Sequence, residues 1–167
     1  MAIHEECGVF GVFSAENTDV ARITYYGLYA LQHRGQEACG IVVGDDGLFY
    51  SHKDTGLVGE VFHNTCLDEF PMGNMAVGHV RYSTCGGSDR KNCQPIEVNH
   101  QKGKMAIAHN GNLSNAAKLK NKLELTGAIF HTTSDTEIIA YIKQPHLTVH
   151  CFSMLLFNIC YKNGQSL

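Results

Sequence analysis

The stretch IHEECGVFGVF, residues 3–13, combines two glutamates, a single cysteine and a run of glycine and apolar residues. The part from Cys7 to Phe13 predicts a buried, apolar first strand whose glycines allow another backbone to approach closely. Cys7 stands at the head of this strand. It is either an ordinary buried thiol or, once Met1–Glu6 are removed, the N-terminal residue of the mature chain.

The pattern beyond this strand predicts an α+β protein. Apolar residues recur at helical spacing from Asp19 to Arg34, and Gly35 stands where a C-cap glycine is expected. Because strands alternate with helices, the sheets are expected to be covered by helices. The next expected elements are a hairpin of strands 38–43 and 48–52, a short helix near 56–70, and strands 75–80 and 104–109. A helix capped by Ser114 is expected to run to Leu125 and to stop at Gly127. After a further short strand, a last helix is expected from 134 to about 142, where Ser134 and Glu137 have the spacing of a capping box.

The composition is that of a globular protein of one domain, with 167 residues, 44% hydrophobic and 17% charged. A net charge of -3 argues against non-specific binding to nucleic acid or to anionic membranes. The start of the chain lacks the features of a secretory signal, and the longest apolar stretch is too short to span a bilayer. We therefore expect a cytoplasmic protein with no nucleic-acid partner and no membrane partner.

The seven cysteines include no C-x2-C pair, so most are expected to be small, buried, reduced thiols. His146 and His150, beside Cys151, have the spacing of a metal-binding pair, but no second pair completes a four-ligand site. No metal site is expected.

Four further stretches are rich in residues suited to catalysis: LQHRGQEACG (31–40), GHVRYSTCGG (78–87), AHNGNL (108–113) and SDTE (134–137). Together with ECGVFG, in this order, they resemble the glutaminase domain of class II (N-terminal nucleophile) glutamine amidotransferases. The resemblance is strongest to the glutamine phosphoribosylpyrophosphate amidotransferase family. It implies a four-layer αββα sandwich, expected to be incomplete at the C-terminus. Residues 1–6 would be a leader, 7–142 a partial glutaminase domain, and 143–167 a divergent tail that does not match the family.

The resemblance makes Cys7 the nucleophile. An N-terminal cysteine carries its own base, an α-amino group with a pKa of about 8, which can take the thiol proton directly or through a water. Asn110 and Gly111 match the family's donors to the oxyanion, although Asn-Gly is also a common hairpin turn.

The remaining expected site residues would bind the substrate glutamine. Arg81 suits its α-carboxylate, because guanidinium offers a planar fork of donors, and Thr84 could add a hydroxyl donor. Asp135 suits the α-ammonium group. The alternative role for Asp135 is that of an acid in the first turn of a helix, which the helix dipole favours, and the two roles can coexist. Arg34 and Gly35 resemble the family segment beside the nucleophile and the bound glutamine.

The implied reaction hydrolyses glutamine to glutamate and ammonia through a γ-glutamyl thioester on Cys7. In the full-length family the ammonia is transferred to phosphoribosyl pyrophosphate, in the first committed step of purine synthesis, by an acceptor domain that this chain lacks. That family forms homo-oligomers and uses Mg2+, and some members hold a 4Fe–4S cluster; these groups are expected outside this segment, so no cofactor is expected within it. Two alternatives stay open: an inactive fragment or a module that binds glutamine or a partner, and the glutaminase part of another class II amidotransferase.

Overall fold

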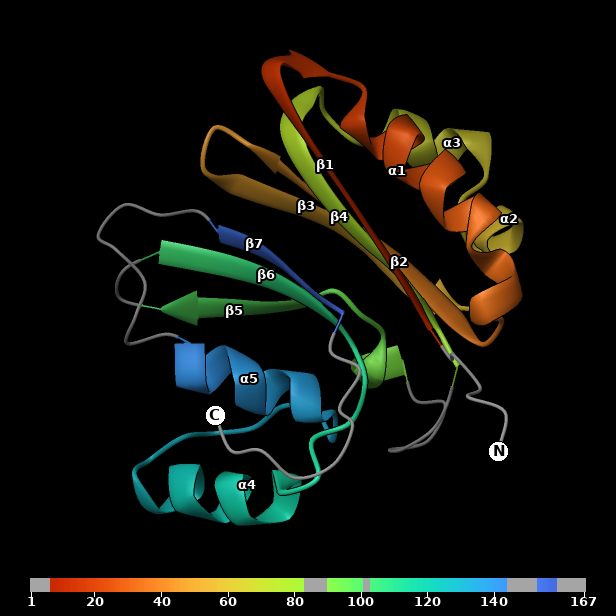
Figure 1. Cartoon of the computed structure of the whole chain (residues 1–167). Helices are drawn as coiled ribbons and strands as arrows, with labels where there is room; N and C mark the ends of the chain where they lie inside the picture. The colour runs from red at the N-terminus through yellow and green to blue at the C-terminus, as the bar shows by residue number, and fades with distance from the viewer. Residues whose placement is uncertain (1–6, 83–89, 101–102, 144–152, 159–167) are drawn as a thin grey trace.

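The computed structural model describes residues 7–82, 90–100, 103–143 and 153–158, which form two sheets and their flanking helices (Figure 1). The larger sheet is antiparallel, with strand order β1-β4-β2-β3. In the smaller sheet, of order β5-β6-β7, β6 runs antiparallel to β5 and parallel to β7. The strands are β1 (Gly8–Thr18), β2 (Ala38–Asp45), β3 (Leu48–Thr55), β4 (Gly73–Arg81), β5 (Ile96–His100), β6 (Gly103–Asn110) and β7 (Ser153–Asn158). The expected α+β class is confirmed.

Three helices cover the outer face of the larger sheet (Figure 1): α1 (Val20–Ala30), α2 (Val58–Val61) and α3 (Asn64–Asp68). Helix α1 lies close to the sheet because β4 presents Gly78 beneath it. A Cβ atom on Gly78 would lie 2.6 Å from Cγ2 of Thr24 and 2.8 Å from Cδ1 of Leu28. Because Gly78 has no side chain, α1 can pack directly against β4.

The smaller sheet is covered on its outer face by α5 (Asp135–Lys143), and α4 (Ala116–Leu125) lies beyond it (Figure 1). Ile107 of β6 packs with Ile139 and Ala140 of α5, whereas α4 buries none of its residues. The two sheets meet through a separate apolar cluster, in which Val42 and Val77 of the larger sheet contact Ala106 and Ala108 of the smaller. None of the helices in the described ranges is long and apolar enough to cross a membrane.

The two helix-end predictions have different outcomes. Gly35 is a C-cap, of the 3-10 helix Gln32–Arg34, but its backbone is extended, with a φ of -154°, and not left-handed. It follows the 3-10 turn Gln32–Arg34 and lies flat on β4, where a Cβ atom would come within 2.6 Å of the carbonyl carbon of Val80. Ser114 does not cap α4, which begins after Asn115 and has no side-chain cap.

Other boundaries also differ from the expectation. The single helix expected near 56–70 is two short helices, α2 and α3, and residues 128–131 do not form the extra strand expected before α5. The short strands β5 and β7 were not predicted, and β7 lies within the segment 143–167. Helix α4 does stop at Gly127, whose φ is 94° and whose N–H donates to the carbonyl of Glu124 at 3.0 Å.

Candidate active site

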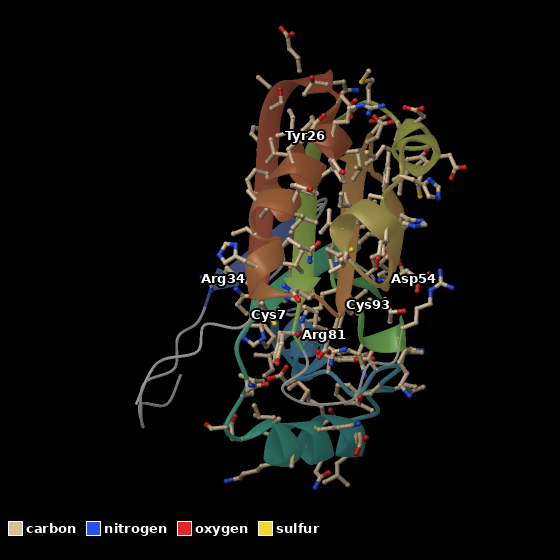
Figure 2. All side chains as sticks on the ribbon, turned by 90° about the vertical axis from the view of Figure 1, so that its right-hand side faces the viewer. Cys7, Tyr26, Arg34, Asp54, Arg81 and Cys93 are labelled. Carbon is tan, nitrogen blue, oxygen red and sulfur yellow. The ribbon has the colours of Figure 1, made fainter. Side chains whose placement is uncertain are left out.

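Cys7 is held at the end of β4 and beside the turn Gln32–Arg34. Its Sγ accepts a hydrogen bond from the N–H of Tyr82 at 3.3 Å and lies 3.5 Å from the Tyr82 carbonyl oxygen. Its own N–H donates to the carbonyl of Arg34 at 2.9 Å, and the Nε of Arg34 donates to the Cys7 carbonyl at 2.8 Å. Figure 2 shows Cys7, Arg34 and Arg81 close together near the middle of the view, between α1 above and α4 below.

The backbone of Cys7 is in the left-handed region, with a φ of 71°. Residues with a Cβ atom rarely adopt this conformation, which costs on the order of 1–3 kcal/mol and persists where the surroundings enforce it. The surrounding hydrogen bonds on both sides of the residue supply that constraint.

Asn110 is the last residue of β6 and lies next to Cys7, and Gly111 follows it. The Nδ2 of Asn110, a side chain only 7% exposed, donates to the carbonyl of Cys7 at 3.1 Å. Gly111 has a φ of 132°, which a residue with a side chain would find strained, and it turns the chain away from the sheet. The pair does not form a hairpin turn, because the chain continues to α4 rather than to a partner strand.

A cavity of about 280 Å³ opens beside the Cys7 thiol. Four of the predicted residues line it: Cys7, Arg81, Gly111 and Asp135. Of the others, Asn110 and Arg34 reach the backbone of Cys7 rather than the cavity wall, and Gly35 lies buried beneath β4. Thr84 lies outside the described residues.

Asp135 is fixed at the first position of α5. Its Oδ2 accepts the N–H of Leu113 at 2.6 Å, and its Oδ1 lies 3.9 Å from Nδ1 of His109. Burial lowers the pKa of His109, and the Asp135 carboxylate opposes that shift only in part. Asp135 thus lies in the first turn of α5 and also lines the cavity.

Glu137 anchors the loop that forms one wall of the cavity. Its carboxylate is 2% exposed and accepts from the N–H of His131 at 3.0 Å, and from the N–H and the hydroxyl of Thr132 at 2.8 Å each. The expected capping box with Ser134 is therefore wrong. Ser134 Oγ does accept the N–H of Thr136 at 3.3 Å, but Glu137 reaches further back along the chain.

Comparison with known proteins places the chain in a family. A family model described as "Glutamine amidotransferase domain" matches residues 67–157. The amidophosphoribosyltransferase of Lacticaseibacillus casei is 48% identical over 152 residues, covering 87% of this chain and 77% of that relative. The chain belongs to the amidophosphoribosyltransferase family. It corresponds to the N-terminal class II glutamine amidotransferase domain of that family.

Solved structures agree with this family. The "structure of the allosteric regulatory enzyme of purine biosynthesis" superposes with a TM-score of 0.75 at 47% identity, covering 84% of this chain and 30% of that one. The amidophosphoribosyltransferase of Bacillus subtilis (strain 168) is 49% identical over 150 residues, covering 88% of this chain. The chain spans 31% of the length of that relative.

Two buried amides join this site to the rest of the glutamine amidotransferase domain, and neither was predicted as a site residue. Gln94 pairs with β6 as a strand would, since its Oε1 accepts the N–H of His109 at 2.7 Å and its Nε2 donates to the same residue's carbonyl at 3.3 Å. Asn92, which is fully buried, accepts the N–H of Thr133 at 3.0 Å. In the sequence, both residues stand in a polar loop before Pro95, within the stretch NCQP (92–95), which indicates a turn but identifies no partner.

Proposed function

We propose that this chain is a glutaminase domain that hydrolyses glutamine to glutamate and ammonia, with Cys7 as the nucleophile. The observation that carries the proposal is that a thiol, the glycine of the Asn-Gly pair, a guanidinium and a carboxylate line one cavity, while the amide of Asn110 donates to the carbonyl of Cys7. The fold that we propose is the four-layer αββα sandwich of N-terminal-nucleophile enzymes. Its support is the pair of facing sheets with helices on both outer sides (Figure 1).

Removal of Met1–Glu6 prepares the nucleophile. The left-handed conformation of Cys7 exists only while a residue precedes it, so cleavage releases that strain and exposes an α-amino group. This amine takes the thiol proton, and the thiolate attacks the side-chain carbonyl carbon of glutamine. The Nδ2 of Asn110 and the N–H of Gly111 then stabilise the tetrahedral oxyanion.

Collapse of the tetrahedral intermediate breaks the carbon–nitrogen bond. Ammonia leaves with the proton that came from the thiol, and the γ-glutamyl group stays on Cys7 as a thioester. Water then attacks the thioester, the oxygen joins the acyl carbon, and a proton returns to sulfur as glutamate is released. No metal or cofactor takes part in this sequence.

The substrate's charged end is bound across the cavity. The buried guanidinium of Arg81 binds the α-carboxylate, with Thr84 as a second donor, and Asp135 binds the α-ammonium group. Arg34 and Gly35 support the site from behind, the first by holding the Cys7 carbonyl and the second by letting its segment lie against β4. For a full-length relative we propose transfer of the ammonia to phosphoribosyl pyrophosphate, as the name amidophosphoribosyltransferase indicates.

Ammonia release from glutamine by the purified full chain tests this function. We expect Cys7→Ala to abolish release, and Cys66→Ala, which changes a buried cysteine outside the cavity, to retain it. Equal release by the chain and its Cys7→Ala variant would contradict the proposal. Glutamine binding without any ammonia release would instead favour a binding module.

A further inference from the structure

A cluster of buried polar atoms lies between the two sheets behind Cys7. Among the described residues, no hydrogen-bond partner reaches either ring nitrogen of His79, Nδ1 of His109 or Oδ1 of Asn110. His79 is completely buried, and the other two are 3% and 7% exposed. An unsatisfied buried polar group costs on the order of 1–3 kcal/mol, so such a cluster calls for an explanation beyond packing.

Strand alternation sets His79 and Asn110 opposite each other. On β4, Gly78 faces α1, so Val77 and His79 face the smaller sheet, and Val77 does pack there against Ala106 and Ala108. The same alternation on β6 puts Asn110 on the face that carries these two alanines. The ring of His79 and the amide of Asn110 therefore share the space between the sheets.

The ring of His79 is neutral and can donate one hydrogen bond. Burial lowers its pKa to about 3, and the nearby backbone of His109 and, to a smaller extent, the amide of Asn110 oppose this shift without offsetting it. These two groups lie close to the ring, although neither meets full hydrogen-bond geometry. A neutral imidazole has one N–H donor and one acceptor nitrogen.

The Asn110 amide must keep one of its two orientations to serve as an oxyanion donor. With Nδ2 toward Cys7, Oδ1 points into the cluster and requires a donor there. After a flip of the amide, its oxygen would face the carbonyl oxygen of Cys7 and no donor would face the reacting group. His109 is a poor source of the proton, since its Nδ1 faces the Asp135 carboxylate.

We infer that His79 is a positioning residue for glutamine hydrolysis: its ring N–H donates to Oδ1 of Asn110 and holds Nδ2 toward the oxyanion. This inference rests on the proposed function, but the contact itself can be tested without catalysis. His79 does not line the cavity, so it acts only through Asn110.

The first test observes the ring proton by nuclear magnetic resonance in the full chain labelled with 15N. We expect one His79 ring N–H that exchanges slowly with water, assigned by its loss in His79→Gln, and shifted upfield in Asn110→Leu. The matched control Glu124→Gln, on the exposed face of α4, should leave this signal unchanged. A His79 ring N–H that is the same with and without the Asn110 amide would overturn the inference, whether or not the chain hydrolyses glutamine.

The second test compares a variant that keeps a donor with one that does not. His79→Gln retains an N–H2 group, whereas His79→Met has similar volume and no donor. Loss of one oxyanion donor lowers kcat about 100-fold or more. We expect that loss in His79→Met with a nearly unchanged KM and an unchanged rate of Cys7 alkylation by iodoacetamide, and kcat within about 5-fold of the parent in His79→Gln, because the retained donor still orients the amide.

Equal loss of kcat in both variants, or none in His79→Met, would overturn the inference. Should either variant fail to fold, the ring-proton measurement decides. Absence of ammonia release from the parent chain would count against the proposed function and leave the ring-proton result standing on its own.

Discussion

Substitution of Glu137 by Gln should lower the free energy of unfolding by several kcal/mol, although it replaces only one oxygen of the side chain by an N–H2 group. The carboxylate is 2% exposed, and it accepts two bonds of 2.8 Å from Thr132 and a third, at 3.0 Å, from the N–H of His131. In the best orientation, the Gln oxygen serves Thr132, and its N–H2 group then faces the N–H of His131. The His131 N–H loses its bond of 3.0 Å and keeps only a longer one, of 3.2 Å, to the oxygen that also serves Thr132, so this part-buried donor is left poorly satisfied, at a cost of up to about 1–3 kcal/mol.

The two bonds that remain also weaken, because they change from charged to neutral acceptors. Bonds to charged groups contribute about 1.5–3 kcal/mol, and neutral ones about 0.5–1.5 kcal/mol. We therefore expect the free energy of unfolding to fall by about 3–5 kcal/mol, out of a total that for most domains is about 5–15 kcal/mol.

Urea unfolding of the full chain, followed by circular dichroism, measures this change. The matched control is Glu124→Gln on the exposed side of α4, which should shift the free energy of unfolding by no more than about 0.5 kcal/mol. If Glu137→Gln is as stable as this control, the carboxylate does not anchor the cavity wall and the reasoning fails.

Three further predictions concern binding, packing and pH. Asp135→Asn removes the carboxylate proposed for the substrate's ammonium group, a loss of about 1.5–3 kcal/mol, so KM for glutamine should rise about 10- to 100-fold; an unchanged KM in a steady-state ammonia assay would argue against that role. Gly78→Val puts a side chain into the contact between α1 and β4, where even a Cβ atom would lie 2.6 Å from Thr24, and should lower the free energy of unfolding in urea by about 1–3 kcal/mol; an unaltered unfolding midpoint would refute this packing. The pKa of His79 falls from 6.5 to about 3 on folding. Its contribution to the free energy of unfolding is therefore fully present above pH 6.5 and is lost as pH falls toward 3, by up to about 1.4 kcal/mol per pH unit. This part of the pH dependence should vanish in His79→Gln, and an identical slope in both proteins between pH 6.5 and 4.5 would contradict it.

The parts of the fold that could be predicted from sequence are those with local signals. The hairpin expected at 38–43 and 48–52 is β2 and β3, whose strands are joined by a turn with Asp46 and Gly47 at positive φ. Strand β7 had no such signal, because it pairs in parallel with β6 across more than forty residues of sequence. The extended conformation of Gly35 had no local signal either, because it depends on close packing against the distant strand β4.

The site residues also divide into those that sequence motifs predict and those that they do not. Cys7, Arg81, Gly111 and Asp135 follow from motifs in the sequence, and the structure lines one cavity with all four. Gln94 and His79 could not be found from the sequence, because their importance depends on which strand they face. A glutamine in a loop and a histidine in a strand are common, and only the fold puts the first against β6 and the second opposite Asn110.

Intact-protein mass, measured before and after treatment with the glutamine-like electrophile diazo-oxonorleucine, tests the central claim most directly. We predict a chain that has lost Met1–Glu6 and gains a single adduct, located on Cys7 by peptide mapping. Competition by glutamine should slow the labelling, since both occupy the same cavity. A chain of full-length mass that gains no adduct, or one labelled at a cysteine other than Cys7, would contradict the account.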